Sequence, residues 1–194
     1  MKIFELIIDE DNKEFGVTAM SIVDMPAIEE DFIFFSNQKV NFAEVDKEKR
    51  ILMGAAMIPD RKIYRKEKDE EFEVFFSKDT VVKASQLFLK NNNQSEATLQ
   101  HEKDLQGLTV VESWIIEDDV HDKSRKFGLN MPIGTWMISM KVDNDDIWNN
   151  YVKDGSVKGF SIEGYFADKL VKQSAQKDED ALLINKIKEI LKNN

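Results

Sequence analysis

The chain has 194 residues and no cysteine, and its composition (42% hydrophobic, 33% charged) carries a formal net charge of −10. This length favours one domain with an appendage, large enough to bury about 70% of the surface of its unfolded chain. The negative charge argues against nucleic-acid binding, because no positive field is present to neutralise phosphates. The lack of cysteine excludes disulfides, thiolate metal sites and a cysteine nucleophile. No apolar stretch is long enough to span a membrane.

Short segments rich in β-branched and aromatic residues dominate the sequence, and polar or turn residues separate them. Such segments are typical of strands. The eight expected strands are Lys2–Ile8, Phe15–Val23, Asp31–Phe35, Arg50–Ile58, Glu71–Ser77, Leu108–Glu117, Gly134–Val142 and Val157–Phe166. A small basic patch on an expected hairpin surface consists of Arg61, Lys62, Arg65 and Lys66.

Two helices are expected between these strands. The first begins after Ser77 or Asp79 and ends in an asparagine run. Its expected apolar face consists of Val81, Ala84, Phe88 and Leu89. The second begins at Asp143 or Asn144 and is closed by Gly155. Its expected apolar residues are Ile147, Trp148, Tyr151 and Val152.

This pattern predicts an α+β, strand-rich fold, in which a barrel or closed sheet is flanked by helices. A composition change near Asp168 divides the chain into a domain of residues 1–168 and an appendage of residues 169–194. In the appendage, a polar linker precedes an amphipathic tail helix with apolar residues at helical spacing. That helix either docks on its own domain, another copy or a partner, or it is a frayed terminus without a role.

Ser161 is the first candidate for chemistry, in the segment Gly159-Phe160-Ser161-Ile162-Glu163-Gly164. On a strand, Phe160 and Ile162 share one face with Phe166 and point to the core, while Ser161 and Glu163 share the other. Gly159 leaves room for a substrate backbone to approach the hydroxyl. The competing interpretation is an ordinary surface serine beside a bulge glycine.

His101 is one of only two histidines, and it precedes Ser161 by sixty residues. Imidazole is the side chain best suited to accept a serine proton near neutral pH. The order of histidine before serine excludes the α/β-hydrolase arrangement, in which the serine comes first. The competing interpretation is a surface histidine at the end of a strand.

Glu112 is expected on an apolar face of its strand, together with Val110 and Trp114. A buried carboxylate needs a partner, which here is either a histidine or a basic side chain. Glu163 is the rival carboxylate, about 7 Å along the strand from Ser161. No metal or other cofactor is expected, because His121 is predicted to lie in a solvated loop and the Asp143–Asp146 segment is better explained by helix capping than by calcium binding.

Five segments in order resemble the prohead (capsid maturation) serine proteases of tailed bacteriophages. They are Arg50–Asp60, His101, Val111–Ile115, Gly134–Met137 and Gly159–Gly164. The segment Ala19–Glu29 also resembles the start of one branch of that family. The likeness covers residues 1–168 and leaves the tail outside.

The resemblance implies a mostly antiparallel barrel related to the herpesvirus assemblins. It implies an endopeptidase that cleaves the phage scaffold and extensions of the major capsid protein inside the procapsid, in the host bacterial cytoplasm, and that often cleaves itself. Ser161 matches the nucleophile and His101 the base. The third assemblin member is a histidine after the serine, which this chain lacks, so we expect Glu112 in that role, with Glu163 as second choice.

Two further expectations come with this resemblance. By analogy with assemblins, a homodimer is a candidate assembly. A capsid-assembly or scaffolding protein that keeps the fold and works only by binding is the alternative function.

Overall fold

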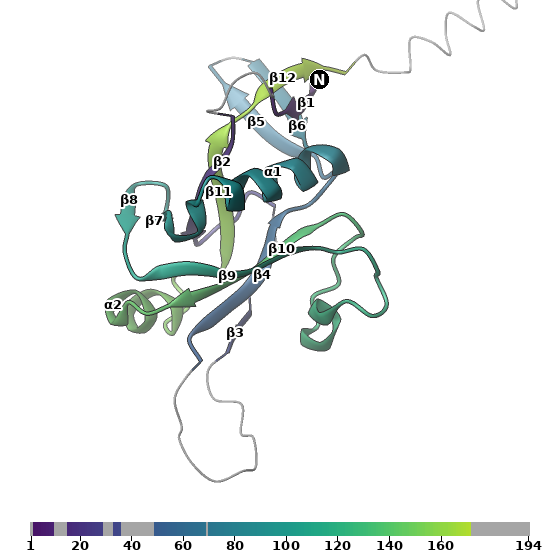
Figure 1. Cartoon of the computed structure of the whole chain (residues 1–194). Helices are drawn as coiled ribbons and strands as arrows, with labels where there is room; N and C mark the ends of the chain where they lie inside the picture. Colours follow the sequence, from purple (N-terminus) through teal and green to yellow (C-terminus); the bar gives the residue numbers. More distant parts are fainter. Residues whose placement is uncertain (1, 10–14, 29–32, 36–48, 69, 172–194) are drawn as a thin grey trace, which may run out of the picture.

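A computed structural model describes residues 2–9, 15–28, 33–35, 49–68 and 70–171 (Figure 1). Twelve strands lie within these ranges, in three four-stranded sheets. Each of the eight strands expected from the sequence is present, so the strand-rich fold class is confirmed. The predicted tail helix lies outside the described residues.

The first sheet, called the hairpin sheet, has the strand order β12-β1-β6-β5. Its strands are β1 (Lys2–Ile7), β5 (Ile63–Glu67), β6 (Glu70–Phe75) and β12 (Ala167–Leu170). The basic patch lies on and beside β5, which pairs antiparallel with β6, as expected for a hairpin. Pairing of β12 with β1 continues through Leu170, opposite Phe4.

The second sheet, called the central sheet, has the order β3-β4-β10-β9. Its strands are β3 (Ile33–Phe35), β4 (Ile51–Met57), β9 (Leu108–Ile115) and β10 (Trp136–Val142). Strand β10 is buried along almost its whole length, and Trp136 is fully buried. A continuous apolar strand of this kind is expected where both faces are covered.

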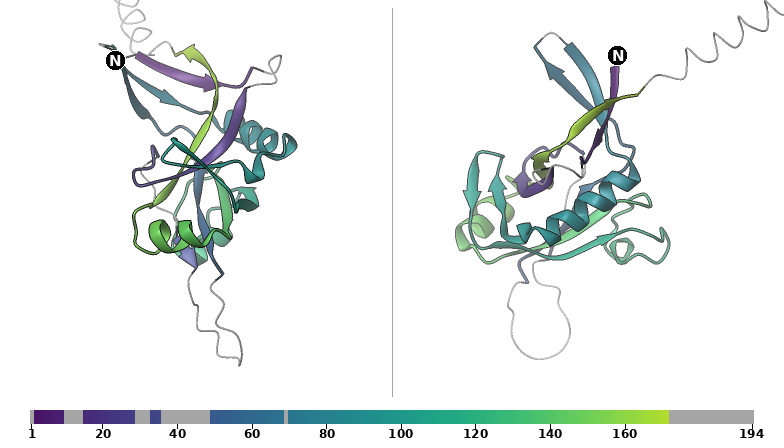
Figure 2. Two further views of the ribbon diagram at one scale, coloured as in Figure 1. Left: turned by 90° about the vertical axis from the view of Figure 1, so that its left-hand side faces the viewer. Right: turned by 45° about the horizontal axis from the view of Figure 1, so that its top comes forward.

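The third sheet, called the serine sheet, has the order β11-β2-β7-β8. Its strands are β2 (Gly16–Val23), β7 (Ala97–Leu99), β8 (Lys103–Leu105) and β11 (Gly159–Tyr165). Strand β11 lies beside β4 of the central sheet and leads directly into β12 of the hairpin sheet. The chain segment that carries Ser161 therefore connects all three sheets (Figures 1 and 2).

Helix α1 (Lys78–Lys90) packs against β2, β9 and β10, and so holds the serine sheet on the central sheet (Figure 2). Ser77 is its N-cap residue, as predicted. The Phe88 ring contacts that of Trp136 edge to face, at 5.5 Å between centroids. Three of the four residues predicted for its apolar face are buried, but Leu89 is 39% exposed and Leu87 packs against the core in its place.

The second predicted helix is also present, divided into α2 (Asp145–Ile147) and a π-helical turn, η3 (Trp148–Val152). Asn144 caps it, because its side-chain oxygen accepts a hydrogen bond from the Ile147 N–H at 3.1 Å. Two short 3₁₀ helices, η1 (Asn93–Ser95) and η2 (Lys123–Phe127), complete the described helices. None of the described helices has the length and apolar character that crossing a membrane requires.

The predicted closed barrel is wrong, although seven of the nine strand pairings among the described residues are antiparallel, as expected. Among the described strands, no pairing closes a sheet on itself, and each of the three sheets keeps two edge strands. The hairpin and serine sheets are also mixed, because β1 pairs parallel with β6 and β2 pairs parallel with β7. Parallel pairs need long crossover connections. Here these connections are the chain between β1 and β6 and the chain between β2 and β7.

Candidate active site

Ser161 lies on β11 directly opposite Ser21 of β2. The predicted alternation is observed: Phe160 is 1% exposed within the core, and Ile162 packs against that core. Residues directly opposite one another in an antiparallel pair point to the same face, with Cβ atoms about 5 Å apart. The side chains of Ser161 and Ser21 therefore start on the same face of the serine sheet.

A β-bulge follows Glu163, where the register between β11 and β2 shifts by one residue. It brings the backbone of Gly164 so close to Gly16 that a Cβ at position 164 would overlap the Gly16 carbonyl oxygen. Gly16 itself has φ +117°, which L side chains rarely adopt. These two glycines thus permit the two backbones to come close together at the bulge. Beyond this bulge, the residues of β11 no longer continue the alternation that places Ser161 and Glu163 on one face.

His101 occupies the turn between β7 and β8. The Glu102 N–H donates to the Leu99 carbonyl at 3.0 Å, and the central residues Gln100 and His101 have φ of 55° and 60°. Two consecutive residues with positive φ define a type I′ hairpin turn, which is usually formed by Asn-Gly. For other L-residues this conformation costs about 1–2 kcal/mol each, and strained residues of this kind cluster at functional sites.

Two contacts hold His101 over the serine sheet, and a third holds its partner Glu163. Its backbone N–H donates to Ser21 Oγ at 3.0 Å, and its Nδ1 lies 3.1 Å from Glu163 Oε1. The hydroxyl of Thr98 on β7 donates to the same Glu163 oxygen. Since Glu163 is two residues from Ser161 on one strand face, the imidazole, the carboxylate and the serine belong to one cluster.

No hydrogen bond joins Ser161 Oγ directly to His101; strand β2, which carries Ser21, lies between β11 and the β7–β8 hairpin. Because Nδ1 faces Glu163, Nε2 is the ring nitrogen left for a proton from the serine. The His101 side chain is 42% exposed and that of Glu163 29%, so a substrate can reach this cluster from solvent. Catalytic hydrogen bonds are often long in free enzymes and tighten when substrate binds.

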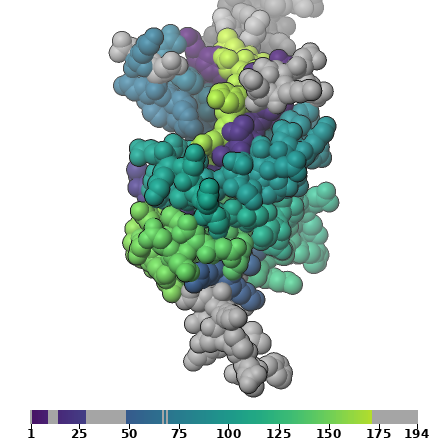
Figure 3. Space-filling model, turned by 60° about the vertical axis from the view of Figure 1, so that its left-hand side comes forward, coloured from purple at the N-terminus to yellow at the C-terminus, as the bar shows by residue number. Residues whose placement is uncertain are grey.

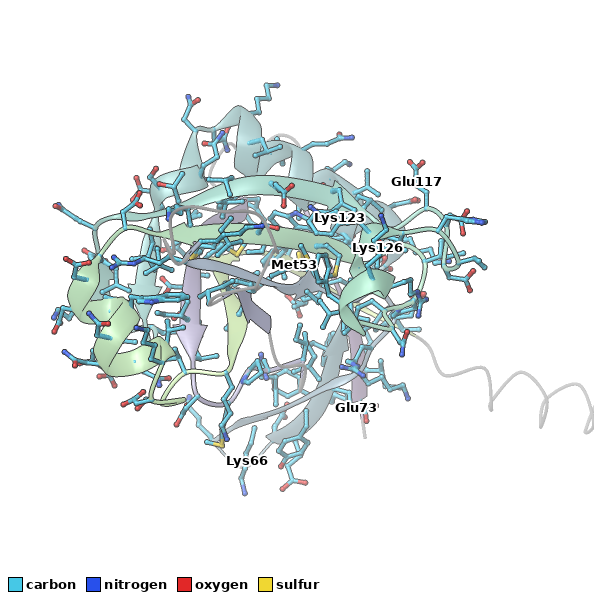
Figure 4. The ribbon with its side chains drawn as sticks, turned by 90° about the horizontal axis from the view of Figure 1, so that it is seen from below. Met53, Lys66, Glu73, Glu117, Lys123 and Lys126 are labelled. Carbon is cyan, nitrogen blue, oxygen red and sulfur yellow. The ribbon has the colours of Figure 1, made fainter. Side chains whose placement is uncertain are left out.

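Glu112, the first-choice third member, does not contact His101. Its carboxylate pairs with Lys123 Nζ at 2.5 Å, and that hydrogen bond is the main reason why the pKa of Glu112 lies below its usual value. The expected burial is also wrong: a register shift in the β9–β10 pairing leaves Val111 as an extra residue, which turns Glu112 out to solvent. Lys123, labelled in Figure 4, lies against the face of Trp114, 4.3 Å from the ring centroid.

His121 lies outside this cluster, as expected, 83% exposed in its loop. Its Nδ1 is 2.8 Å from Asp118 Oδ2, and this hydrogen bond is the main cause that lowers the pKa of Asp118 to about 2. Among the residues that the structure describes, no group of three or more histidine, aspartate or glutamate side chains is arranged to hold a metal ion.

Ser21 and Thr98 belong to the cluster, and sequence reasoning missed both. Each is a small polar residue within an apolar strand, and both are buried. A buried hydroxyl inside a strand needs a hydrogen-bond partner, so the sequence did hold a signal. It did not show which partner each hydroxyl has, because the parallel pairing of β2 with β7 comes from the fold.

A serine, an imidazole and a carboxylate on one sheet form the constellation of a candidate serine hydrolase. Residues 39–170 match the protein family described as putative phage serine protease XkdF. The chain therefore belongs to that family, and the predicted resemblance to phage serine proteases is confirmed at this level. No curated protein and no solved structure matches the chain.

Proposed function

We propose that the protein is a serine endopeptidase in which Ser161 is the nucleophile, His101 the general base and Glu163 the residue that orients the imidazole. The observation that carries this proposal is the 3.1 Å contact between His101 Nδ1 and Glu163 Oε1, on the sheet face that Ser161 shares. The strained turn that presents His101 supports it.

The proposed reaction begins when His101 Nε2 accepts the Ser161 proton and the hydroxyl oxygen attacks a peptide carbonyl. The imidazolium that forms is stabilised by the Glu163 carboxylate at Nδ1, and it then donates its proton to the leaving amine. In the second half of the reaction, His101 Nε2 takes a proton from a water molecule, whose oxygen attacks the acyl carbonyl; the bond to Ser161 Oγ breaks, and the imidazolium returns the proton to that oxygen. The Ser21 hydroxyl assists by holding the His101 backbone in place.

The proposed substrates are the phage scaffold and extensions of the major capsid protein, cleaved inside the procapsid in the host cytoplasm, with self-cleavage as a further reaction. Family membership supports a protease role in phage maturation. The homodimer and the relation to herpesvirus assemblins stay predictions, on which this mechanism does not depend.

A fluorophosphonate probe tests the proposal, because it reacts only with an activated serine. We expect the wild-type protein to be labelled at Ser161, with the modified peptide identified by mass spectrometry. Ser161→Ala and His101→Ala should lose labelling. Ser95→Ala, which removes an exposed hydroxyl on η1, is the matched control and should be labelled normally.

Incubation with the phage scaffold protein completes the test. Fragments should appear with the wild-type protein and not with Ser161→Ala. A folded wild-type protein that neither reacts with the probe nor cuts the scaffold would reject the peptidase and leave the capsid-assembly role as the better account.

A further inference from the structure

A cavity of about 180 Å³ lies next to Ser161, between strand β11 and the hairpin sheet. Most of the residues that line it are apolar, and polar atoms make up the smaller part of its surface. The lining comes from β1, β4, β5, β6 and β11, with the loop after β2: Leu6, Ala27, Ile28, Ala56, Met57, Ile58, Ile63, Arg65, Val74, Phe76, Phe160, Ser161, Ile162, Gly164 and Phe166. An engineered apolar cavity of about 150 Å³ takes up benzene, so this volume suits one apolar side chain.

The cavity runs along the edge of β11 that faces away from β2. Phe160, Ser161 and Ile162 all line it, although consecutive side chains of a strand point to opposite faces. A cavity that meets three consecutive residues must lie beside the strand rather than over one face. Among the described strands, β11 pairs only with β2, so the cavity lies at the outer edge of the serine sheet.

Arg65 brings the single charge to this lining. It follows Ile63 on the same face of β5, is exposed, and donates to the Tyr64 carbonyl at 3.1 Å. Its neighbours Lys62 and Lys66 pair with Glu73 and Glu71, whereas no carboxylate among the described residues pairs with Arg65. Lys66 and Glu73 mark this hairpin in Figure 4, and Figure 3 shows it in blue beside the yellow-green segment that follows β11 in the chain.

We propose that this cavity is the specificity pocket for one side chain of a substrate peptide that binds beside β11. It takes one leucine-, isoleucine- or methionine-sized side chain, and Arg65 selects an aspartate or glutamate within two positions of it. Because Ser161 itself lines the cavity, a side chain bound there brings the backbone of the peptide close to Ser161. The proposal rests on the proposed peptidase function for its biological meaning.

The test measures binding first, so that its outcome does not depend on catalysis. The immobilised Ser161→Ala protein is exposed to a pool of random decapeptides, and bound peptides are sequenced by mass spectrometry. We expect enrichment of an aliphatic residue with an acidic residue within two positions. In Arg65→Glu the acidic preference should fall about two- to fivefold, as for one exposed ion pair, and basic residues should replace it.

Two variants complete the design. Lys66→Glu makes the same charge change on the same strand at a residue that does not line the cavity, and it should bind the wild-type selection of peptides. Ala27 lines the cavity and is exposed, so Ala27→Leu adds a larger side chain to the part of the wall that faces solvent. This variant should prefer peptides with smaller apolar side chains, since one methylene in an apolar pocket changes discrimination about 10- to 200-fold.

Peptides without an acidic preference, or a selection unchanged in Arg65→Glu, would overturn the pocket assignment even if the fluorophosphonate probe labels Ser161. Conversely, an unlabelled Ser161 together with the expected peptide selection would reject the peptidase and keep the pocket.

Discussion

Replacing Glu163 with glutamine separates the two carboxylates considered for the third member. The change keeps the size of the side chain and an oxygen for the Thr98 hydroxyl, but it removes the negative charge 3.1 Å from His101 Nδ1. If Glu163 stabilises the imidazolium that forms during catalysis, removal of its charge must lower the rate at which Ser161 attacks.

The magnitude follows from the contact. A hydrogen bond to a charged group contributes about 1.5–3 kcal/mol, and a neutral one about 0.5–1.5. Because His101 is 42% exposed, solvent screens the charge and the low end applies. A difference of about 1–1.5 kcal/mol corresponds to a roughly five- to thirteenfold slower reaction, and more if the amide turns its NH₂ to Nδ1 and fixes the wrong tautomer.

The assay is the second-order rate of fluorophosphonate labelling at Ser161, which needs no knowledge of the substrate. Glu112→Gln is the matched control, because it makes the same chemical change at the carboxylate that pairs with Lys123, and its rate should stay within about twofold of wild type. Equal rates for Glu163→Gln and wild type, with both variants folded by thermal melting, would refute the assignment of Glu163. A slow Glu112→Gln would return the role to Glu112.

Three further predictions concern the turn, the bulge and one surface carboxylate. Gln100→Gly should raise the free energy of unfolding by about 0.5–1 kcal/mol in urea titrations, because relief of the positive φ outweighs the entropy of glycine; a decrease would argue against the type I′ turn. Gly164→Ala should lower it by about 1–3 kcal/mol, since the added methyl overlaps the Gly16 carbonyl, and an unchanged midpoint would contradict the close approach. Asp118 should titrate near pH 2 by NMR and return toward 3.8, its ordinary value, in His121→Ala. Its folded-state pKa is depressed, so the stability it contributes is present above about pH 4 and is lost as the pH falls through about 2.

Local patterns predicted the elements of this fold, but not how they assemble. Alternation placed Phe160 on the buried face of β11, and capping placed Ser77 and Asn144 at the starts of helices. The barrel failed because strand pairing is not local: the parallel pairing of β1 with β6 joins segments some seventy residues apart. No short-range signal encodes such a pairing.

In the candidate site, too, local chemistry could be predicted from the sequence, whereas contacts that depend on strand pairing could not. The chemistry of the side chains was enough to select Ser161 and His101 as candidates, because so few histidines are present. The choice of carboxylate could not be made this way, since the bulge in the β9–β10 pairing reverses the face on which Glu112 lies. Glu163 reaches His101 only because the short β7–β8 hairpin lies beside β2.

The segment that carries the serine is paired at one end with β2 and, through β12, at the other end with β1. During synthesis, β1 is made before the other described strands, and β12, with which it pairs, is made last among them. We therefore expect Ser161, the proposed nucleophile, to reach its final position only late in synthesis, and the proposed peptidase to stay inactive until β12 has paired with β1.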